Sequence, residues 1–192
     1  MKVKGHQFNY NEYTVWIKEL VAERKTSGES QSEALIGFTV LNQKRMQRLD
    51  KTIELNHALK EKLSRLIGKQ VWYVLAEPWC GDCAQNVPVI GKMAAYAEDK
   101  IDLRIILRGE NPEWMEKYHT NGSKSVPKLI AFNTDGNELF TWGARPKEAQ
   151  ELLLSWKKNP NGRTWDDFEK ELYTWYAKDK IQTIQNEFYE LL

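Results

Sequence analysis

The chain of 192 residues contains 41% hydrophobic and 29% charged residues, with 6 Pro, 11 Gly and only 2 Cys. This composition is typical of a globular protein, and it excludes a collagen-like chain, a disordered chain and a disulfide-rich mini-protein. Because 28 basic and 27 acidic residues leave a net charge of +1, the sequence predicts no general attraction to nucleic acid or to a membrane surface.

Helices are predicted for the first third of the chain. Apolar residues recur at helical spacing over 10–25, a long helix is expected after Ser32, and a short one between Asn56 and Gly68. The expected apolar face of the long helix consists of Leu35, Phe38, Leu41, Met46, Leu49 and Ile53. Its basic residues, which are interpreted as a solvated face rather than a nucleic-acid site, are Lys44, Arg45, Arg48 and Lys51.

Strands and helices alternate in the predicted central part of the chain. Two continuous apolar runs predict strands covered on both faces, and two later runs joined by an Asp-Gly turn predict an antiparallel hairpin. A helix bent by Pro88 is expected to end near residue 98, and a short helix is expected at 112–118. The predicted strands are 71–75, 101–107, 128–132 and 138–142.

Two further helices are predicted after the hairpin, one from Pro146 to about residue 159 and a single amphipathic one from 165 to about 189. The helical regions at both ends are too small to hold cores of their own, so the chain is predicted to be a single globular unit of the α/β class. Its expected parts are an N-terminal helical extension packed on the core (1–68), the core (69–160) and a C-terminal helix (161–192).

The sequence contains no apolar run of about 18 residues, which is the length that a membrane-spanning helix needs. Residues 1–13 also lack the apolar stretch of a secretory signal. The expected location is therefore the cytoplasm, without attachment to a membrane.

Cys80 and Cys83 are the only cysteines, and their close spacing is the most informative feature of the sequence. Exchange with a disulfide requires a thiolate that attacks and a second thiol near enough to release the mixed disulfide. Directly after a strand and at the start of a helix, residues three apart lie on one face. The positive end of the helix dipole should favour the thiolate of Cys80, while Cys83 should be less exposed and react second.

The region from Gln70 to Trp156 resembles the thioredoxin superfamily. Trp79 precedes the cysteine pair, Pro88 stands at the helix-bending proline of thioredoxins, and Val126-Pro127 stands at their cis-proline loop. Gly143 matches as well. A closer resemblance, over nearly the whole chain, is to bacterial thioredoxin-like proteins with the motif Glu-Pro-Trp-Cys-Gly-Asp, here 77–82.

The resemblance implies a thioredoxin-like fold with a central mixed four-stranded sheet, flanked by helices and extended by helices at both ends. It also implies a groove in which the backbone of Val126 pairs with a substrate strand and Pro127 shapes the surface. Trp79 would be an exposed aromatic beside the nucleophile, and Gly81 and Asp82 would complete the substrate-binding residues.

Three departures from thioredoxins bear on the chemistry. Val74 stands where thioredoxins have a buried Asp that accepts a proton. The proton of Cys83 would then have to pass to Glu77 or to water, or the protein has no residue dedicated to this role. Glu77 itself is interpreted first as a solvated residue at the end of a strand. Asp82 replaces a proline between the cysteines. Its carboxylate, which also suits the first turn of a helix, should oppose a thiolate and so favour a reducing potential.

Two other readings of the cysteines remain open. They could be ordinary core thiols or a structural clip, since the cytoplasm keeps thiols reduced. A zinc site is also conceivable, but zinc takes four ligands and the remaining soft donors, His6, His57 and His119, form no close pair. No Gly-rich phosphate loop follows a strand, so nucleotide chemistry has no support.

The sequence therefore predicts a thiol–disulfide oxidoreductase that reduces or exchanges protein disulfides, with Cys80 as nucleophile and Cys83 as resolving thiol. It implies no metal and no organic cofactor. The partners would be protein disulfides or thiols and an unidentified reductant. The alternative is an interaction protein without catalysis that binds peptides in the groove beside Trp79 and Pro127.

Overall fold

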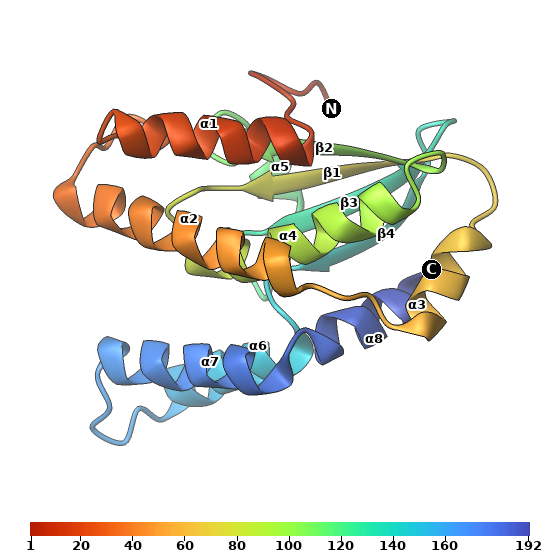
Figure 1. Ribbon diagram of the computed structural model, residues 1–192. Coiled ribbons are helices and arrows are strands. Elements are labelled where there is room, and N and C mark those ends of the chain that lie inside the picture. Colours follow the sequence, from red (N-terminus) through yellow and green to blue (C-terminus); the bar gives the residue numbers. More distant parts are fainter.

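Four strands form the central sheet: β1 (Gln70–Ala76), β2 (Ile101–Leu107), β3 (Lys128–Asn133) and β4 (Glu138–Gly143). The computed structural model describes all residues from 1 to 192 (Figure 1). The strands lie in the order β2-β1-β3-β4, with β1 parallel to β2 and antiparallel to β3, and with β3 antiparallel to β4. The predicted α/β fold with a mixed four-stranded sheet and a terminal hairpin is confirmed.

Helices cover both faces of the sheet. α4 (Gly81–Tyr96) runs along the near face in Figure 1, and α5 (Pro112–Lys117) lies behind the sheet. On the α5 side, the ring of Trp114 lies 5.0 Å from that of Tyr73. Because side chains alternate along a strand, the neighbouring Trp72 points to the opposite face, where it is completely buried. The apolar run of β1 is thus buried on both sides.

The N-terminal helices pack onto this layer: α1 (Tyr10–Ala22), α2 (Glu33–Thr52) and α3 (His57–Ser64). Tyr13 and Ile17 of α1 belong to the main hydrophobic core, as do residues of α2 and α3. Phe8, just before α1, exchanges two backbone hydrogen bonds with Ile105, of 2.9 and 2.7 Å, at the free edge of β2. The N-terminal region therefore adds to the core of the sheet and holds no separate one.

The apolar face expected for α2 is partly wrong. Phe38 and Leu41 are 44% and 43% exposed. The buried stripe instead includes Thr39, whose hydroxyl lies 2.7 Å from that of Thr26, and Asn42, which donates to the carbonyl of Pro78 at 2.9 Å. Met46, Leu49 and Ile53 are buried as predicted. Because polar groups with hydrogen-bond partners can be buried at little cost, apolar periodicity alone missed the N-terminal half of the buried stripe.

The single helix expected at the C-terminus is in fact two, α7 (Trp165–Asp179) and α8 (Gln182–Leu191). The left-handed residues Lys180 and Ile181 separate them, with φ of 48° and 63°. The two halves have different packing partners: α7 packs on α6 (Lys147–Lys158), whereas α8 packs on α3. The predicted boundary between 160 and 161 therefore falls between α6 and α7, which share a small core of Ala149, Leu153, Phe168 and Leu172.

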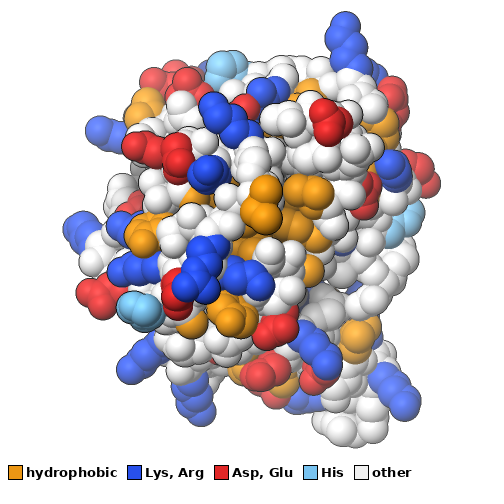
Figure 2. Space-filling model, turned by 90° about the vertical axis from the view of Figure 1, so that its right-hand side faces the viewer, with side chains coloured by type: hydrophobic (Ala, Val, Ile, Leu, Met, Phe, Trp, Pro, Cys, Tyr) orange, Lys and Arg blue, Asp and Glu red, His pale blue; other side chains and the backbone are white.

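α8 returns the chain to the main core, where the ring of Phe188 lies 5.6 Å from that of Trp72. Figure 2 looks onto the end of the molecule that carries α3, α8 and the C-terminus, and it shows apolar side chains gathered in the middle of this face among charged ones. No helix of the chain is long and apolar enough to cross a membrane.

Candidate active site

Cys80 and Cys83 lie at the N-terminal end of α4, directly after β1. Cys80 is the N-cap residue of α4 and is half-buried, whereas Cys83 lies in the first turn and is only 2% exposed. Both are free thiols. The Sγ of Cys80 donates a hydrogen bond of 3.2 Å to the carbonyl of Val126. The structure therefore gives the two thiols unequal access to solvent, with Cys80 the more accessible one.

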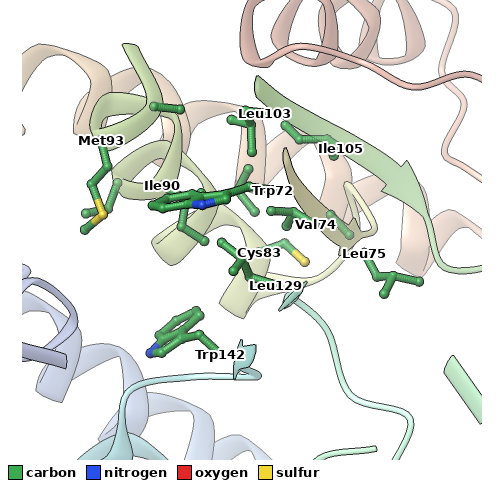
Figure 3. Packing of buried hydrophobic residues seen from close by; sticks show 14 of the residues in the cluster. Trp72, Val74, Leu75, Cys83, Ile90, Met93, Leu103, Ile105, Leu129 and Trp142 are labelled. Atoms are coloured by element: carbon green, nitrogen blue, oxygen red, sulfur yellow. The ribbon is translucent and has the colours of Figure 1, made fainter. Parts of the chain in front are cut away.

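The Cys83 thiol points into the core, where Figure 3 shows it beside Val74, Leu75 and Leu129. Its Sγ accepts a hydrogen bond of 3.5 Å from the backbone N–H of Glu77. Burial, followed by the hydrogen bond and the charge of the Cys80 thiol, raises the pKa of Cys83 well above its ordinary value. Cys83 is therefore held as a neutral thiol.

The loop before β3 approaches the cysteines from the opposite side. The peptide bond between Val126 and Pro127 is cis, and it is the carbonyl of Val126 that accepts from Cys80. The backbone N–H of Val126 donates to no acceptor within the protein. At Gly143, which has a φ of 121°, a Cβ atom would lie 2.2 Å from the carbonyl oxygen of Pro127. Glycine at this position thus lets β4 come close to the loop.

Asp82 is buried between the cysteines, and its carboxylate accepts three hydrogen bonds from two residues that the sequence analysis missed. Both Nε and Nη2 of Arg145 donate to its Oδ2, the former at 3.0 Å, and the hydroxyl of Tyr176 donates to its Oδ1 at 2.8 Å. The side chains of Arg145 and Asp82 are 10% and 9% exposed. The nearby guanidinium therefore offsets much of the carboxylate field that the sequence analysis assigned to Asp82 alone.

Glu77 is not the solvated strand end that the sequence suggested, because it is only 3% exposed. One carboxylate oxygen accepts from the hydroxyl of Ser27, and the other accepts from the backbone N–H of Gly109 at 2.8 Å. Ser27 lies in the loop between α1 and α2. A buried carboxylate beside the motif is thus held by the N-terminal region, which explains why it can leave solvent.

The helices α2 and α7 meet over Gly81. The guanidinium of Arg45, on α2, lies 3.8 Å from the centre of the Tyr173 ring on α7. A Cβ atom on Gly81 would lie 1.8 Å from the Tyr173 hydroxyl and 3.4 Å from a guanidinium nitrogen of Arg45. Arg45 is half-buried, so the expectation of a fully solvated basic face on α2 fails at this residue.

A groove of about 380 Å³ runs past Cys80 between α2 and α7. The half-buried ring of Trp79 forms part of its wall, with the guanidinium of Arg108 4.8 Å from the ring centre. Of the substrate-binding residues predicted from the sequence, Trp79, Gly81, Asp82 and Val126 line the groove with Cys80, and Pro127 does not. The groove has the size of a small-ligand or peptide site. No group of three or more His, Cys, Asp or Glu side chains is placed to hold a metal.

Long-range partners are what the sequence analysis missed. Arg145 and Tyr176 follow Asp82 by 63 and 94 residues, and Ser27 precedes Glu77 by 50. The polar residues Asp82 and Glu77 in a stretch that is otherwise apolar were the one available signal, since such groups need partners when they are buried. These two polar residues indicate that buried hydrogen-bond partners exist, but the sequence does not identify which residues the partners are.

Comparisons with known proteins find similar sequences and a similar fold. Residues 28–160 match the family model described as thioredoxin. Over 79 residues the chain is 38% identical to the thioredoxin of Bacillus subtilis, which covers 41% of this chain and 72% of that protein. It is 34% identical over 70 residues to thioredoxin 1 of Nostoc sp., covering 36% of this chain and 63% of that one. The chain therefore matches less than two thirds of the length of the Nostoc protein.

One solved structure resembles almost the whole chain. It is a protein of unknown function from Pseudomonas aeruginosa, with a TM-score of 0.57, 18% identity and 96% coverage of both chains. At this identity the likeness concerns the fold alone. It extends over 96% of the chain, whereas the matches to the two thioredoxins cover 36% and 41% of it.

Proposed function

Because this chain belongs to the thioredoxin family, we propose that it is a thiol–disulfide oxidoreductase that reduces or exchanges protein disulfides. The observation that carries the proposal is the unequal pair at the start of α4. A half-buried Cys80 with its thiol in the groove precedes a buried Cys83 by one helical turn. This arrangement suits attack by the first thiol and resolution by the second.

In the proposed reaction, the Cys80 thiolate attacks one sulfur of a substrate disulfide. The substrate S–S bond breaks, its first sulfur leaves and takes a proton, and a mixed disulfide forms on Cys80. Cys83 then gives up its proton as its sulfur attacks that of Cys80, the mixed disulfide bond breaks, and the second substrate sulfur leaves and takes a proton. Two electrons and two protons pass from the cysteine pair to the substrate. An external dithiol reductant, which is not identified, restores the pair.

The surroundings of Cys80 support binding of an extended substrate. The unpaired N–H of Val126 is available to a substrate backbone. The ring of Trp79 offers a flat apolar contact next to the nucleophile. We propose Trp79, Gly81, Asp82, Val126 and Pro127 as the substrate-binding residues, together with the catalytic pair.

Reduction of insulin disulfides by the protein in the presence of dithiothreitol tests this proposal. Activity should be lost in Cys80→Ser. In Cys83→Ser, which keeps the nucleophile, the mixed disulfide should persist when the variant is incubated with insulin without dithiothreitol, and it should be visible on a non-reducing gel. The matched control Cys83→Ala should give the same trapped species, because the trapping depends on loss of the thiol and not on the serine hydroxyl. Equal rates for the protein and Cys80→Ser would overturn the proposal.

A second candidate function is an interaction protein that binds peptides in the groove without turnover. The observation in its favour is that α2 and α7 enclose the site and meet over Gly81, which restricts access to Cys80. Binding of peptides that contain no cysteine, with equal affinity in Cys80→Ser, would favour this alternative if insulin reduction were also absent.

A further inference from the structure

Two guanidinium groups in the groove have no carboxylate partner. Four basic side chains line it, and two of these are neutralised: Arg145 by Asp82, and Lys124 by Glu116. Arg45 and Arg108 form no ion pair. The acidic side chains that line the groove are Asp82, which is already paired, and Glu169. The groove therefore carries an excess of positive charge in a protein whose net charge is only +1.

The two free guanidiniums are fixed on either side of Cys80 along the motif. Arg45 lies against the Tyr173 ring, next to Gly81, and its Nη1 donates to the side chain of Asn42 at 2.9 Å. Arg108 lies against the ring of Trp79 and donates to the carbonyl of Lys124 at 3.4 Å. Stacking on an aromatic ring holds a guanidinium in place and leaves its other donors free for a ligand.

We propose that the groove selects a polypeptide segment whose disulfide-bonded cysteine is flanked by acidic residues. This inference rests on the proposed function and specifies its substrate class. Because side chains alternate along an extended chain, a segment aligned with Val126 would place the side chains two positions before and two positions after its cysteine on the face of that cysteine, toward the two ends of the groove. Carboxylates there would pair with Arg45 and Arg108, and the field of these groups would speed the encounter with an acidic segment.

The shape of the groove favours a narrow segment over the broad surface of a folded domain. It lies between two helices and has a volume of about 380 Å³, which is within the range of peptide and small-ligand sites. Its lining includes apolar side chains such as Leu35 and Trp165 as well as the guanidiniums. The expected segment is therefore extended and carries apolar residues beyond the acidic ones.

The test compares matched peptide disulfides that differ only in the residues two positions before and two positions after cysteine: Glu at both, Gln at both, or Lys at both. The second-order rate constant with the reduced protein should decrease from Glu to Gln to Lys. Added salt should reduce the difference between Glu and Lys peptides. Arg45→Gln and Arg108→Gln should each lower the ratio of the Glu rate to the Lys rate, by about threefold.

The control variant Arg45→Lys keeps the positive charge but loses the planar guanidinium, so it should retain most of the preference. If the ratio fell as far as in Arg45→Gln, a structural role for Arg45 would replace the proposed one.

Equal rates for the three peptides would overturn the inference while leaving the proposed function intact. The inference would also be overturned, with the proposed function intact, if charge mattered only for small disulfides. In that case the acidic oxidised glutathione would react faster than the basic cystamine, while the three peptides reacted at equal rates. If no peptide reacted faster than with Cys80→Ser, the proposed function would fail and the inference with it.

Discussion

Asp82, between the two cysteines, forms a buried ion pair with Arg145, which follows β4. The Nε of Arg145 lies 3.0 Å from Oδ2 of Asp82, and the hydroxyl of Tyr176 occupies the other carboxylate oxygen. A thiolate at Cys80 is therefore close to a carboxylate and to the guanidinium that neutralises it. Only a small part of the repulsion expected from the Asp82 carboxylate alone remains. This relationship makes the reduction potential of the cysteines depend on two residues with opposite effects.

Asp82→Asn should make the reduction potential less negative, and Arg145→Gln should make it more negative. The first substitution leaves a guanidinium that stabilises the thiolate and hence the reduced form, and the second leaves a carboxylate that destabilises it. A change of one pKa unit in the thiol corresponds to roughly 30 mV. Equilibration with a dithiothreitol redox buffer measures both potentials.

The double variant is the control for this prediction. With both charges removed, the potential should return close to that of the unmodified protein. Arg145→Gln alone should also unfold at lower urea concentration, because it leaves a buried carboxylate without its cation, at a cost of about 3 kcal/mol or more. A potential that moved in the same direction in both single variants would contradict the charge argument.

Gly81→Ala should disturb the contact between the motif and α7. The added Cβ would lie 1.8 Å from the Tyr173 hydroxyl, so either the tyrosine or the whole helix must move. Gly37→Ala is the matched control, since Gly37 lies in α2 with nothing within 4 Å of its Cβ position. The control should raise the free energy of unfolding by about 0.5–1 kcal/mol, which is the usual gain for alanine over glycine in a helix.

Two measurements compare the variants Gly81→Ala and Gly37→Ala. One is the fluorescence of the protein during urea unfolding, and the other is the rate at which iodoacetamide alkylates Cys80. Gly81→Ala should unfold earlier and expose Cys80 to faster alkylation. If Gly81→Ala were as stable as Gly37→Ala and alkylated at the unmodified rate, the close approach of Tyr173 would be wrong.

The sheet could be predicted from the sequence because its signals are local. The continuous apolar run at β1 and the Asp-Gly turn before β4 each specify a strand without knowledge of the rest of the chain. The cysteine pair could be placed at a helix start for the same reason. The helix α2 was predicted as well, but only part of its buried face, because burial of Thr39 and Asn42 depends on Thr26 and Pro78, which are distant in the sequence.

The surroundings of the cysteines were least predictable. Arg45 on α2, Tyr173 on α7 and Arg145 after β4 come together only when the helices at both ends of the chain pack around the motif. Likewise, the break at Lys180 and Ile181 arises because α7 and α8 pack on different partners. A continuous helical pattern contains no information about that change of partner.

Ser27→Ala should destabilise the protein by about 1.5–3 kcal/mol, which is typical of a hydrogen bond to a charged group. The substitution removes the hydroxyl that donates to Glu77, and leaves a buried carboxylate with Gly109 as its remaining hydrogen-bond donor. Glu77→Gln in the Ser27→Ala background should recover part of the loss, since a neutral amide is easier to bury. Urea unfolding of the three variants provides the measurement, and additive losses would contradict a direct interaction.

Tyr13→Phe should raise the free energy of unfolding by about 1 kcal/mol, because a buried hydroxyl without a partner is unfavourable. The Tyr13 hydroxyl is buried and has no hydrogen-bond partner. Burial, followed by the charges of Cys83 and Glu77, raises the pKa of Tyr13 well above its ordinary value, so the hydroxyl stays neutral. A loss of stability in urea unfolding would show that the hydroxyl does have a partner, such as an ordered water.

The stability of the reduced protein should fall as the pH rises above about 8.5, where a thiol in the unfolded chain loses its proton. Burial raises the pKa of Cys83, so the folded chain keeps its proton there and binds more protons than the unfolded chain. The free energy of unfolding should therefore fall by up to about 1.4 kcal/mol per pH unit. Urea unfolding at several pH values should show a shallower fall for Cys83→Ala, which keeps all the tyrosines, and parallel pH profiles for the two proteins would contradict the assignment to Cys83.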